Sequence, residues 1–168
     1  KDVIFSGVGK STAEIDLALK VGVGCFNVES HSELIRIQQR AEVAEKVAPI
    51  SIRVNPDVDA KTHPYISTGL KNNKFGVDAE TALTLYSIAA DANALRIDGI
   101  DCHIGSQIAD ADPLLQALNS VLELVDILSK QAIASHSNPL PAADWHHIRR
   151  LHLLRWNHAD RPRCHHGA

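Results

Sequence analysis

A short apolar run followed by a stretch of helical periodicity occurs four times in succession along this chain. The apolar runs, which predict strands, cover residues 2–5, 25–28, 49–54 and 97–104. The stretches that predict helices cover residues 12–21, 31–47, 79–92 and 113–130. A strand–helix unit repeated in this way predicts an α/β fold with a parallel sheet and right-handed crossover connections. Four units correspond to half of an eight-fold barrel or to the centre of a doubly wound sheet, and periodicity alone does not choose between them.

The predicted strands are short and apolar, and we expect both of their faces to be apolar, as in buried parallel strands. Ser11 and Thr12 both fit as the N-cap of the first helix, and Ser11, with Glu14 three residues later, has the spacing of a capping box. Asp78 is the N-cap of the third helix. For the helix between them, Ser30 and Ser32 both fit as the N-cap. On the last helix, apolar spacing predicts an inner face made of Leu114, Leu118, Val121, Leu122 and Val125.

Polar residues follow each predicted strand at its carboxyl end. These segments are 6–10, 27–30, 53–56 and 103–107. In both architectures ligands bind at this end of the strands, so we expect the functional site there. A polar loop of roughly 20 residues, rich in Gly and Pro, runs from Pro56 to Gly76, and loops that long in compact α/β units are usually functional.

Three residues at these ends are candidates for binding one anionic, planar ligand. His103 ends the fourth predicted strand, and Ser106 supplies a hydroxyl suited to a phosphate. Gly105 between them allows backbone to approach a ligand closely. Arg53 lies at the matching end of the preceding strand, where a buried cation requires an anionic partner.

Neighbouring residues have simpler structural interpretations. Alternation along the strand turns Cys102 away from His103, which predicts a buried apolar cysteine, and we expect Asp101 to face the helices. The Gly-Lys-Ser sequence at 9–11 resembles the end of a phosphate-binding P-loop, but the first glycine of that motif would fall at Ile4. We therefore interpret this segment as a glycine turn between a strand and a helix.

Four segments together resemble the family of pyridoxal-phosphate (PLP) dependent decarboxylases that act on ornithine, arginine and diaminopimelate, and within it the diaminopimelate decarboxylases. They read FSGVGKS (5–11), FNVES (26–30), RVNPDVDAKTHPYISTGLKNNKFG (53–76) and GIDCHIGSQI (99–108). The resemblance implies that residues 1–133 are part of a (β/α)8 TIM-type barrel, covering its third to sixth strands. It also implies PLP as cofactor, with His103 stacked on the pyridine ring, Ser106 near the phosphate and Arg53 close to the ring.

The resemblance further implies a carboxy-lyase, with an amino-acid substrate, that converts meso-diaminopimelate to lysine in lysine biosynthesis, and a homodimeric parent enzyme. The HIGSQ segment is shared with arginine and ornithine decarboxylases, which are the alternative, whereas the loop 68–76 favours diaminopimelate. No segment matches the family's Schiff-base lysine strand, its Gly-Gly-Gly and Glu-Pro-Gly-Arg motifs or its carboxy-terminal β domain. We therefore identify no catalytic residue in these 168 residues and expect the polypeptide itself to be inactive. A non-catalytic, decarboxylase-like binding partner is a further alternative.

Composition changes abruptly near residue 135. Residues 1–135 contain three His, no Trp and a net charge of −6, whereas 136–168 contain seven His, both Trp, no Lys and a net charge of +3. We interpret 134–168 as an aberrant tail, out of frame or vector-derived. The alternatives are a metal-binding appendage, although its spacings match no standard zinc pattern, and an amphipathic basic helix over 145–156.

Overall composition excludes several classes of partner. A net charge of −3 gives no electrostatic footprint for nucleic acid. No apolar run approaches the roughly 18 residues that a membrane span needs. The three cysteines do not form a disulfide framework, which favours a reducing compartment and predicts a cytoplasmic protein without a metal site.

Overall fold

The computed structural model describes residues 3–58, 75–105, 111–134 and 150–153. Its strands form one parallel sheet whose order follows the chain, β1-β2-β3-β4-β5. The strands are β1 (Ile4–Phe5), β2 (Cys25–Val28), β3 (Ala48–Val54), β4 (Leu95–Cys102) and β5 (Arg150–Leu153). A doubly wound sheet reverses its strand order at a switch point, whereas a barrel adds each strand beside the previous one. The uninterrupted order therefore selects the barrel from the two predicted architectures.

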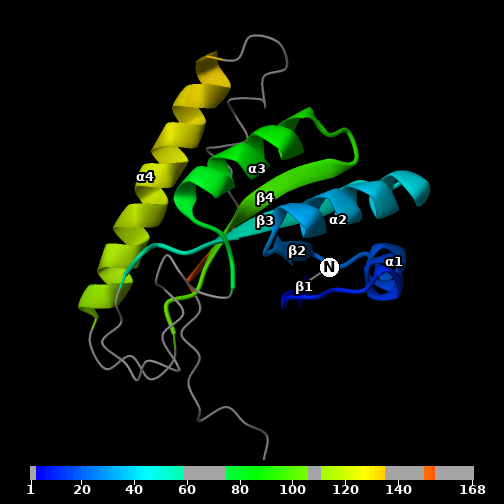
Figure 1. Ribbon diagram of the computed structural model, residues 1–168, viewed down its shortest axis with the longest axis horizontal. Coiled ribbons are helices and arrows are strands. Elements are labelled where there is room, and N and C mark those ends of the chain that lie inside the picture. The colour runs from blue at the N-terminus through cyan, green and yellow to red at the C-terminus, as the bar shows by residue number, and fades with distance from the viewer. Residues whose placement is uncertain (1–2, 59–74, 106–110, 135–149, 154–168) are drawn as a thin grey trace, which may run out of the picture.

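Four helices connect the strands and lie along the sheet in the same order (Figure 1). They are α1 (Thr12–Val21), α2 (His31–Val43), α3 (Ala79–Asp91) and α4 (Asp112–Ala134). In Figure 1, α1 and α4 lie at opposite ends of the sheet, and α2 and α3 lie between them. The described part of the chain thus contains successive β/α units of a barrel wall, confirming the predicted fold class.

The two faces of the sheet differ in chemistry. Alternate residues of the strands, on the face toward the helices, belong to the apolar core: Phe26, Val28, Ile50, Ile52, Val54, Ile100 and Cys102. The residues between them are polar and also buried: Asn27, Ser51, Arg53 and Asp101. The expectation of strands that are apolar on both faces is therefore wrong. Because successive side chains of a strand point to opposite faces, the same strands contribute an apolar layer under the helices and a polar layer on the inner face of the barrel wall.

The predicted helix starts are confirmed. Ser11 caps α1 in a complete capping box with Glu14, Ser30 caps α2, and Asp78 caps α3. The predicted end of α2 near residue 47 is wrong, because the helix ends at Val43. After its C-cap the chain turns sharply, with Glu45 at a φ of +52°, and enters β3. A short left-handed turn of this kind leaves no periodic signal in the sequence.

The inner face of α4 is only partly the predicted one. Val121 is buried, but Leu122 is 47% exposed. Buried positions of this helix include Pro113, Ala117, Val121, Leu124 and Leu128. Ala117 was not among the predicted positions, because that prediction used large apolar residues only. Its small side chain fits the close contact between helix and sheet.

The fifth strand lies in the compositionally distinct tail. β5 pairs in parallel with β4, with Arg150 beside Gly99 and His152 beside Asp101. The alternative of a helix over 145–156 is therefore wrong at 150–153, and its other residues lie outside the described ones. Whether 134–168 is an aberrant tail is not decided by this strand and stays a prediction. Among the described helices, none is long and apolar enough to cross a membrane.

Candidate functional site

The polar layer inside the wall is densest at the carboxyl ends of β2, β3 and β4. Glu29 follows β2, Arg53 is the penultimate residue of β3, and Asp101 lies beside Arg53 in β4. All three are buried, with at most 8% of the residue exposed. His103 lies two residues beyond Asp101, on the same face, and its side chain is 22% exposed. Removing a charged group from water costs free energy, so each buried charge needs a partner of opposite charge or a hydrogen bond. These partners define the geometry of the site.

Arg53 is the central cation of this cluster. Its Nη1 lies 3.1 Å from Oε2 of Glu29, and its guanidinium lies 5.4 Å from the centre of the Phe75 ring. Gly76 follows at a φ of +75°, and a Cβ there would lie 2.8 Å from the Arg53 carbonyl oxygen. A glycine is therefore required where the chain returns from the long loop and passes over the end of β3.

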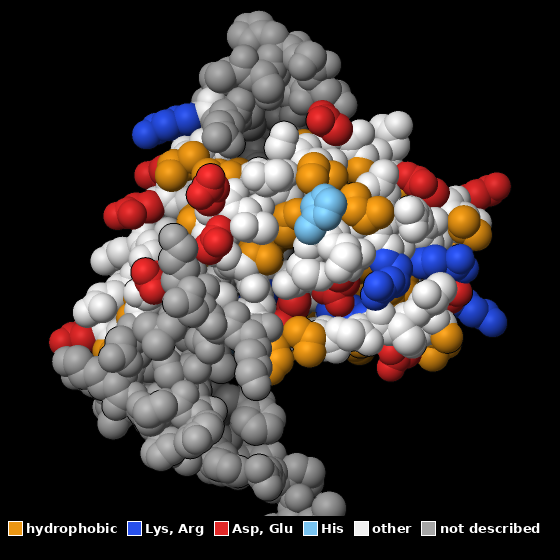
Figure 2. All heavy atoms as spheres, viewed as in Figure 1, with side chains coloured by type: hydrophobic (Ala, Val, Ile, Leu, Met, Phe, Trp, Pro, Cys, Tyr) orange, Lys and Arg blue, Asp and Glu red, His pale blue; other side chains and the backbone are white. Residues whose placement is uncertain are grey.

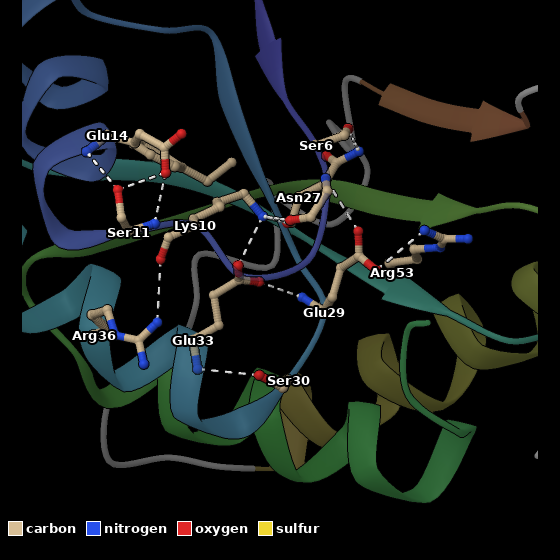
Figure 3. A network of polar contacts seen from close by, with 12 residues as sticks. Ser6, Lys10, Ser11, Glu14, Asn27, Glu29, Ser30, Glu33, Arg36 and Arg53 are labelled. Atoms are coloured by element: carbon tan, nitrogen blue, oxygen red, sulfur yellow. Dashed lines mark hydrogen bonds and ion pairs between the residues drawn. The ribbon is translucent and has the colours of Figure 1, made fainter. Parts of the chain in front are cut away.

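A second buried ion pair closes the adjacent loops. Lys10 is 3% exposed, and its Nζ lies 2.9 Å from Oε1 of Glu33. The same ammonium donates to the carbonyl oxygen of Asn27 at 2.7 Å (Figure 3) and to that of Gly7, also at 2.7 Å. A lysine ammonium has three protons, so this set uses all of its donors. Lys10 thereby ties the turn after β1 to the end of β2, which explains structurally why a lysine ends the glycine turn.

Hydrogen bonds between neutral side chains fill the layer below these charges. Asn27 Nδ2 donates to the hydroxyl of Ser6 at 2.8 Å, and Ser51 donates to Oδ1 of Asn27 at 3.1 Å. Asn27 and Ser51 are adjacent in register on β2 and β3. These hydrogen bonds satisfy the side chains of Asn27 and Ser51, which are almost completely buried, and join β2 and β3 to the exposed residue that follows β1.

Asp101 and His103 form the remaining polar pair. Oδ2 of Asp101 lies 3.2 Å from Nε2 of His103. Neither carboxylate oxygen has a hydrogen-bond partner within the described ranges, although the residue is completely buried. The expectation that Asp101 faces the helices is wrong. Its neighbour Cys102 faces them instead, and burial raises the pKa of that thiol to about 12. Cys102 is therefore a neutral core residue, as predicted, and not a nucleophile.

The structure brings together two of the three predicted ligand-binding residues. Arg53 and His103 lie on the same face, at the carboxyl ends of adjacent strands. Ser106 lies outside the described residues. Three further residues are buried charges that were not predicted individually, although the first two lie in the predicted polar segments: Lys10, Glu29 and Glu33. The strict alternation of apolar and polar residues in 26–29 and 50–55 was the signal that could have revealed the polar face.

This set of groups fits part of a site for an anionic, planar, aromatic ligand. Nε of Arg53 is buried and has no hydrogen-bond partner among the described residues, so one donor of the guanidinium is unused. The partly exposed imidazole of His103 offers a flat surface beside it. A cation with an unused donor next to an aromatic ring suits an anionic, aromatic cofactor such as PLP.

Comparison with known proteins gives the family. Residues 1–137 match the family described as pyridoxal-dependent decarboxylase, pyridoxal binding domain. The chain belongs to this family. It is 59% identical over 130 residues to the diaminopimelate decarboxylase of Neisseria meningitidis serogroup B, and this region is 77% of the chain and 31% of the relative. It is 54% identical over 131 residues to that of Pseudomonas aeruginosa, covering 78% of the chain and 32% of the relative.

Solved structures agree with the sequence comparison. Diaminopimelate decarboxylase from Helicobacter pylori, complexed with L-lysine, aligns with 92% of this chain and 44% of its own, at a TM-score of 0.75 and 36% identity. The enzyme from M. jannaschii aligns with 76% of this chain and 30% of its own, at a TM-score of 0.69 and 38% identity. The predicted resemblance is confirmed, and PLP is the cofactor of the family. The chain spans about a third of the length of the curated relatives it matches.

Proposed function

We propose that these residues form the cofactor-binding wall of a decarboxylase that converts meso-diaminopimelate to L-lysine. The observation that carries the proposal is the pair of Arg53 and His103 on one polar face in a chain of this family. The relatives at 59% and 54% identity, both diaminopimelate decarboxylases, support this substrate. Arginine or ornithine as substrate is an outcome that the test below distinguishes.

Each site residue has a proposed task. The His103 imidazole packs against the ring of the cofactor, the Arg53 guanidinium donates a hydrogen bond to it, and Ser106 contacts its phosphate. When bound, PLP supplies an electron sink for the charge left by the departing carboxylate. Asp101, whose Oδ2 lies 3.2 Å from Nε2 of His103, is proposed to hold this edge of the imidazole in place by electrostatic attraction.

The remaining proposals concern the polypeptide and its assembly. We expect the 168-residue polypeptide alone to have no decarboxylase activity, because no segment in it matches the Schiff-base lysine strand. The parent enzyme is proposed to be a homodimer in the cytoplasm. Light scattering on the complete enzyme tests the dimer, and an assay of the polypeptide with added PLP tests the inactivity.

The test of function uses a chimaera. In it, the aligned 130-residue region of this chain replaces its counterpart in the Neisseria meningitidis relative. We expect PLP binding and release of CO2 from meso-diaminopimelate, and loss of PLP affinity of about tenfold or more on Arg53→Lys or His103→Ala. A folded chimaera without activity on diaminopimelate would overturn the proposal. Turnover of arginine or ornithine in its place would support the alternative substrates.

A further inference from the structure

Glu29 is a buried carboxylate that is not among the residues proposed to contact the cofactor. Its side chain is 2% exposed. Oε1 accepts a hydrogen bond from the backbone N–H of Gly7 at 3.2 Å, and Oε2 lies 3.1 Å from Nη1 of Arg53. Its own backbone N–H donates to Oε2 of Glu33 at 2.7 Å. The carboxylate is thus fixed by contacts with the loop after β1 and with β3, and the backbone of Glu29 is fixed on Glu33.

The neighbouring cation does not neutralise Glu29. All three donors of Lys10 are used, by Glu33 and the carbonyl oxygen of Asn27 (Figure 3) and by the carbonyl oxygen of Gly7. Arg53 is therefore the cation that balances Glu29 among the described side chains. The four charges form two separate buried pairs, joined through the backbone of Glu29.

Among the described residues, Arg53 forms its ion pair through Nη1. Nη1 is fixed on Glu29, whereas Nε is buried and has no partner among the described residues. The guanidinium is planar, so fixing one nitrogen and stacking the group 5.4 Å from the Phe75 ring orients the remaining donors. An arginine without this anchor has many rotamers and would lose them on binding a ligand.

We propose that Glu29 is a positioning residue that orients Arg53 toward the cofactor and couples it to the ion pair between Lys10, in the loop after β1, and Glu33, in the first turn of α2. This inference rests on the proposed function, because it gives Glu29 a task only if Arg53 contacts the cofactor. It assigns a role to the glutamate of the FNVES segment, which the sequence comparison alone leaves without one.

The experiment is a double-mutant cycle on the chimaera, measured as the dissociation constant for PLP and as the thermal unfolding of the apoprotein. Glu29→Gln is expected to weaken PLP binding about tenfold, and Arg53→Lys by a similar factor. In the Arg53→Lys background, Glu29→Gln should add less than about a twofold loss, because the group it positions is gone. Glu29→Asp, which keeps the charge but shortens the reach, provides the same comparison if the glutamine variant does not fold.

The matched control is Asp16→Asn. Asp16 forms a bidentate ion pair with Arg40 between α1 and α2, at 2.7 and 2.9 Å, and both side chains are partly exposed. Its loss should lower stability without moving the PLP dissociation constant by more than about twofold. A merely structural Glu29 would behave like this control.

The outcomes separate the two proposals. If Arg53→Lys weakens PLP binding but Glu29→Gln does not, or if their effects multiply, the positioning role is overturned and the proposed function stands. If the unmodified chimaera binds no PLP, or Arg53→Lys leaves the constant unchanged, the proposed site fails and the positioning role fails with it.

Discussion

At Gly76 the backbone passes close to Arg53 of the candidate site. Gly76 lies at a φ of +75°, and a Cβ would lie 2.8 Å from the Arg53 carbonyl oxygen and 3.1 Å from the Arg53 Cγ. Gly22 has nearly the same φ, +72°, but a Cβ there would meet nothing within 4 Å. A substitution at Gly22 therefore introduces backbone strain alone, whereas one at Gly76 introduces both backbone strain and a steric clash.

We predict that Gly76→Ala destabilises the chimaera by about 3 kcal/mol, since strain and a backbone clash act together. Gly22→Ala should cost about 1 kcal/mol, from strain alone. Chemical denaturation of both variants measures the difference. Equal losses would show that the chain over β3 moves aside, and that Gly76 does not constrain Arg53.

At the scale of single residues, the chemical type of a site residue was easier to predict from the sequence than the face of the sheet on which its side chain lies. Arg53 and His103 were predicted because a cation and an imidazole after apolar strands require an explanation. Asp101 was assigned to the wrong face, although its place two residues before His103 puts both on one side of the strand. Glu29 was not predicted individually because its partner comes from another strand, and pairing across strands is not visible in one sequence.

At the scale of elements, the start of α1 carries the most completely formed cap. The Ser11 hydroxyl accepts from the Glu14 N–H at 3.3 Å, and the Glu14 carboxylate accepts from the Ser11 backbone N–H at 2.8 Å. Two hydrogen bonds from Ser11 lower the pKa of Glu14 below its ordinary value of 4.5, and the one from the Ser11 side chain has a larger effect than the one from its backbone. A carboxyl whose folded pKa is lowered stabilises the fold above its unfolded pKa and loses this effect as pH falls.

We predict that Ser11→Ala costs about 1 kcal/mol of unfolding free energy near pH 7. The cost should shrink as pH falls below 4.5, where Glu14 becomes protonated and its half of the box is lost. The matched control is Thr84→Ala, which removes an exposed mid-helix hydroxyl that donates a hydrogen bond to the backbone carbonyl oxygen of Glu80. Its cost should show no such pH dependence. A cost for Ser11→Ala that does not change with pH would contradict the coupling.

Elements were predicted closely where local chemistry determines them. Capping residues at Ser11, Ser30 and Asp78 fixed three helix starts, because the signal and the bond it forms lie within one turn. The end of α2 at Val43 and the fifth strand at Arg150–Leu153 were not predicted. A strand in that position depends on pairing with β4, which lies about 50 residues earlier in the chain.

At the scale of the whole molecule, the end helices expose apolar side chains. Leu17 and Val21 on α1 and Leu115, Leu122 and Ile127 on α4 are at least 43% exposed. Over α4, apolar side chains lie among acidic ones (Figure 2). In a complete barrel each helix has a neighbour on both sides, so these are the surfaces where further β/α units would pack.

We predict opposite effects of Leu122→Glu in two settings. In the 168-residue polypeptide the change should reduce self-association, seen by light scattering, because it interrupts an exposed apolar surface. In the chimaera it should lower stability by about 2 kcal/mol, because the leucine is there buried against the next unit. Gln116→Glu, at an exposed polar position of the same helix, should change neither. An unchanged chimaera would place the next unit elsewhere.

The order of the sheet has a consequence for synthesis on the ribosome. Among the described strands, each from β2 to β5 pairs with the strand made just before it. Each new strand therefore finds its first partner already made at the free edge of the sheet, whereas in a doubly wound sheet the chain has to return to an older edge. The wall can therefore be assembled from its amino-terminal end as the nascent chain emerges, each β/α unit docking on a surface that is already formed. Until the following unit arrives, the newest edge of the growing sheet and its helix are the parts that a chaperone would have to shield.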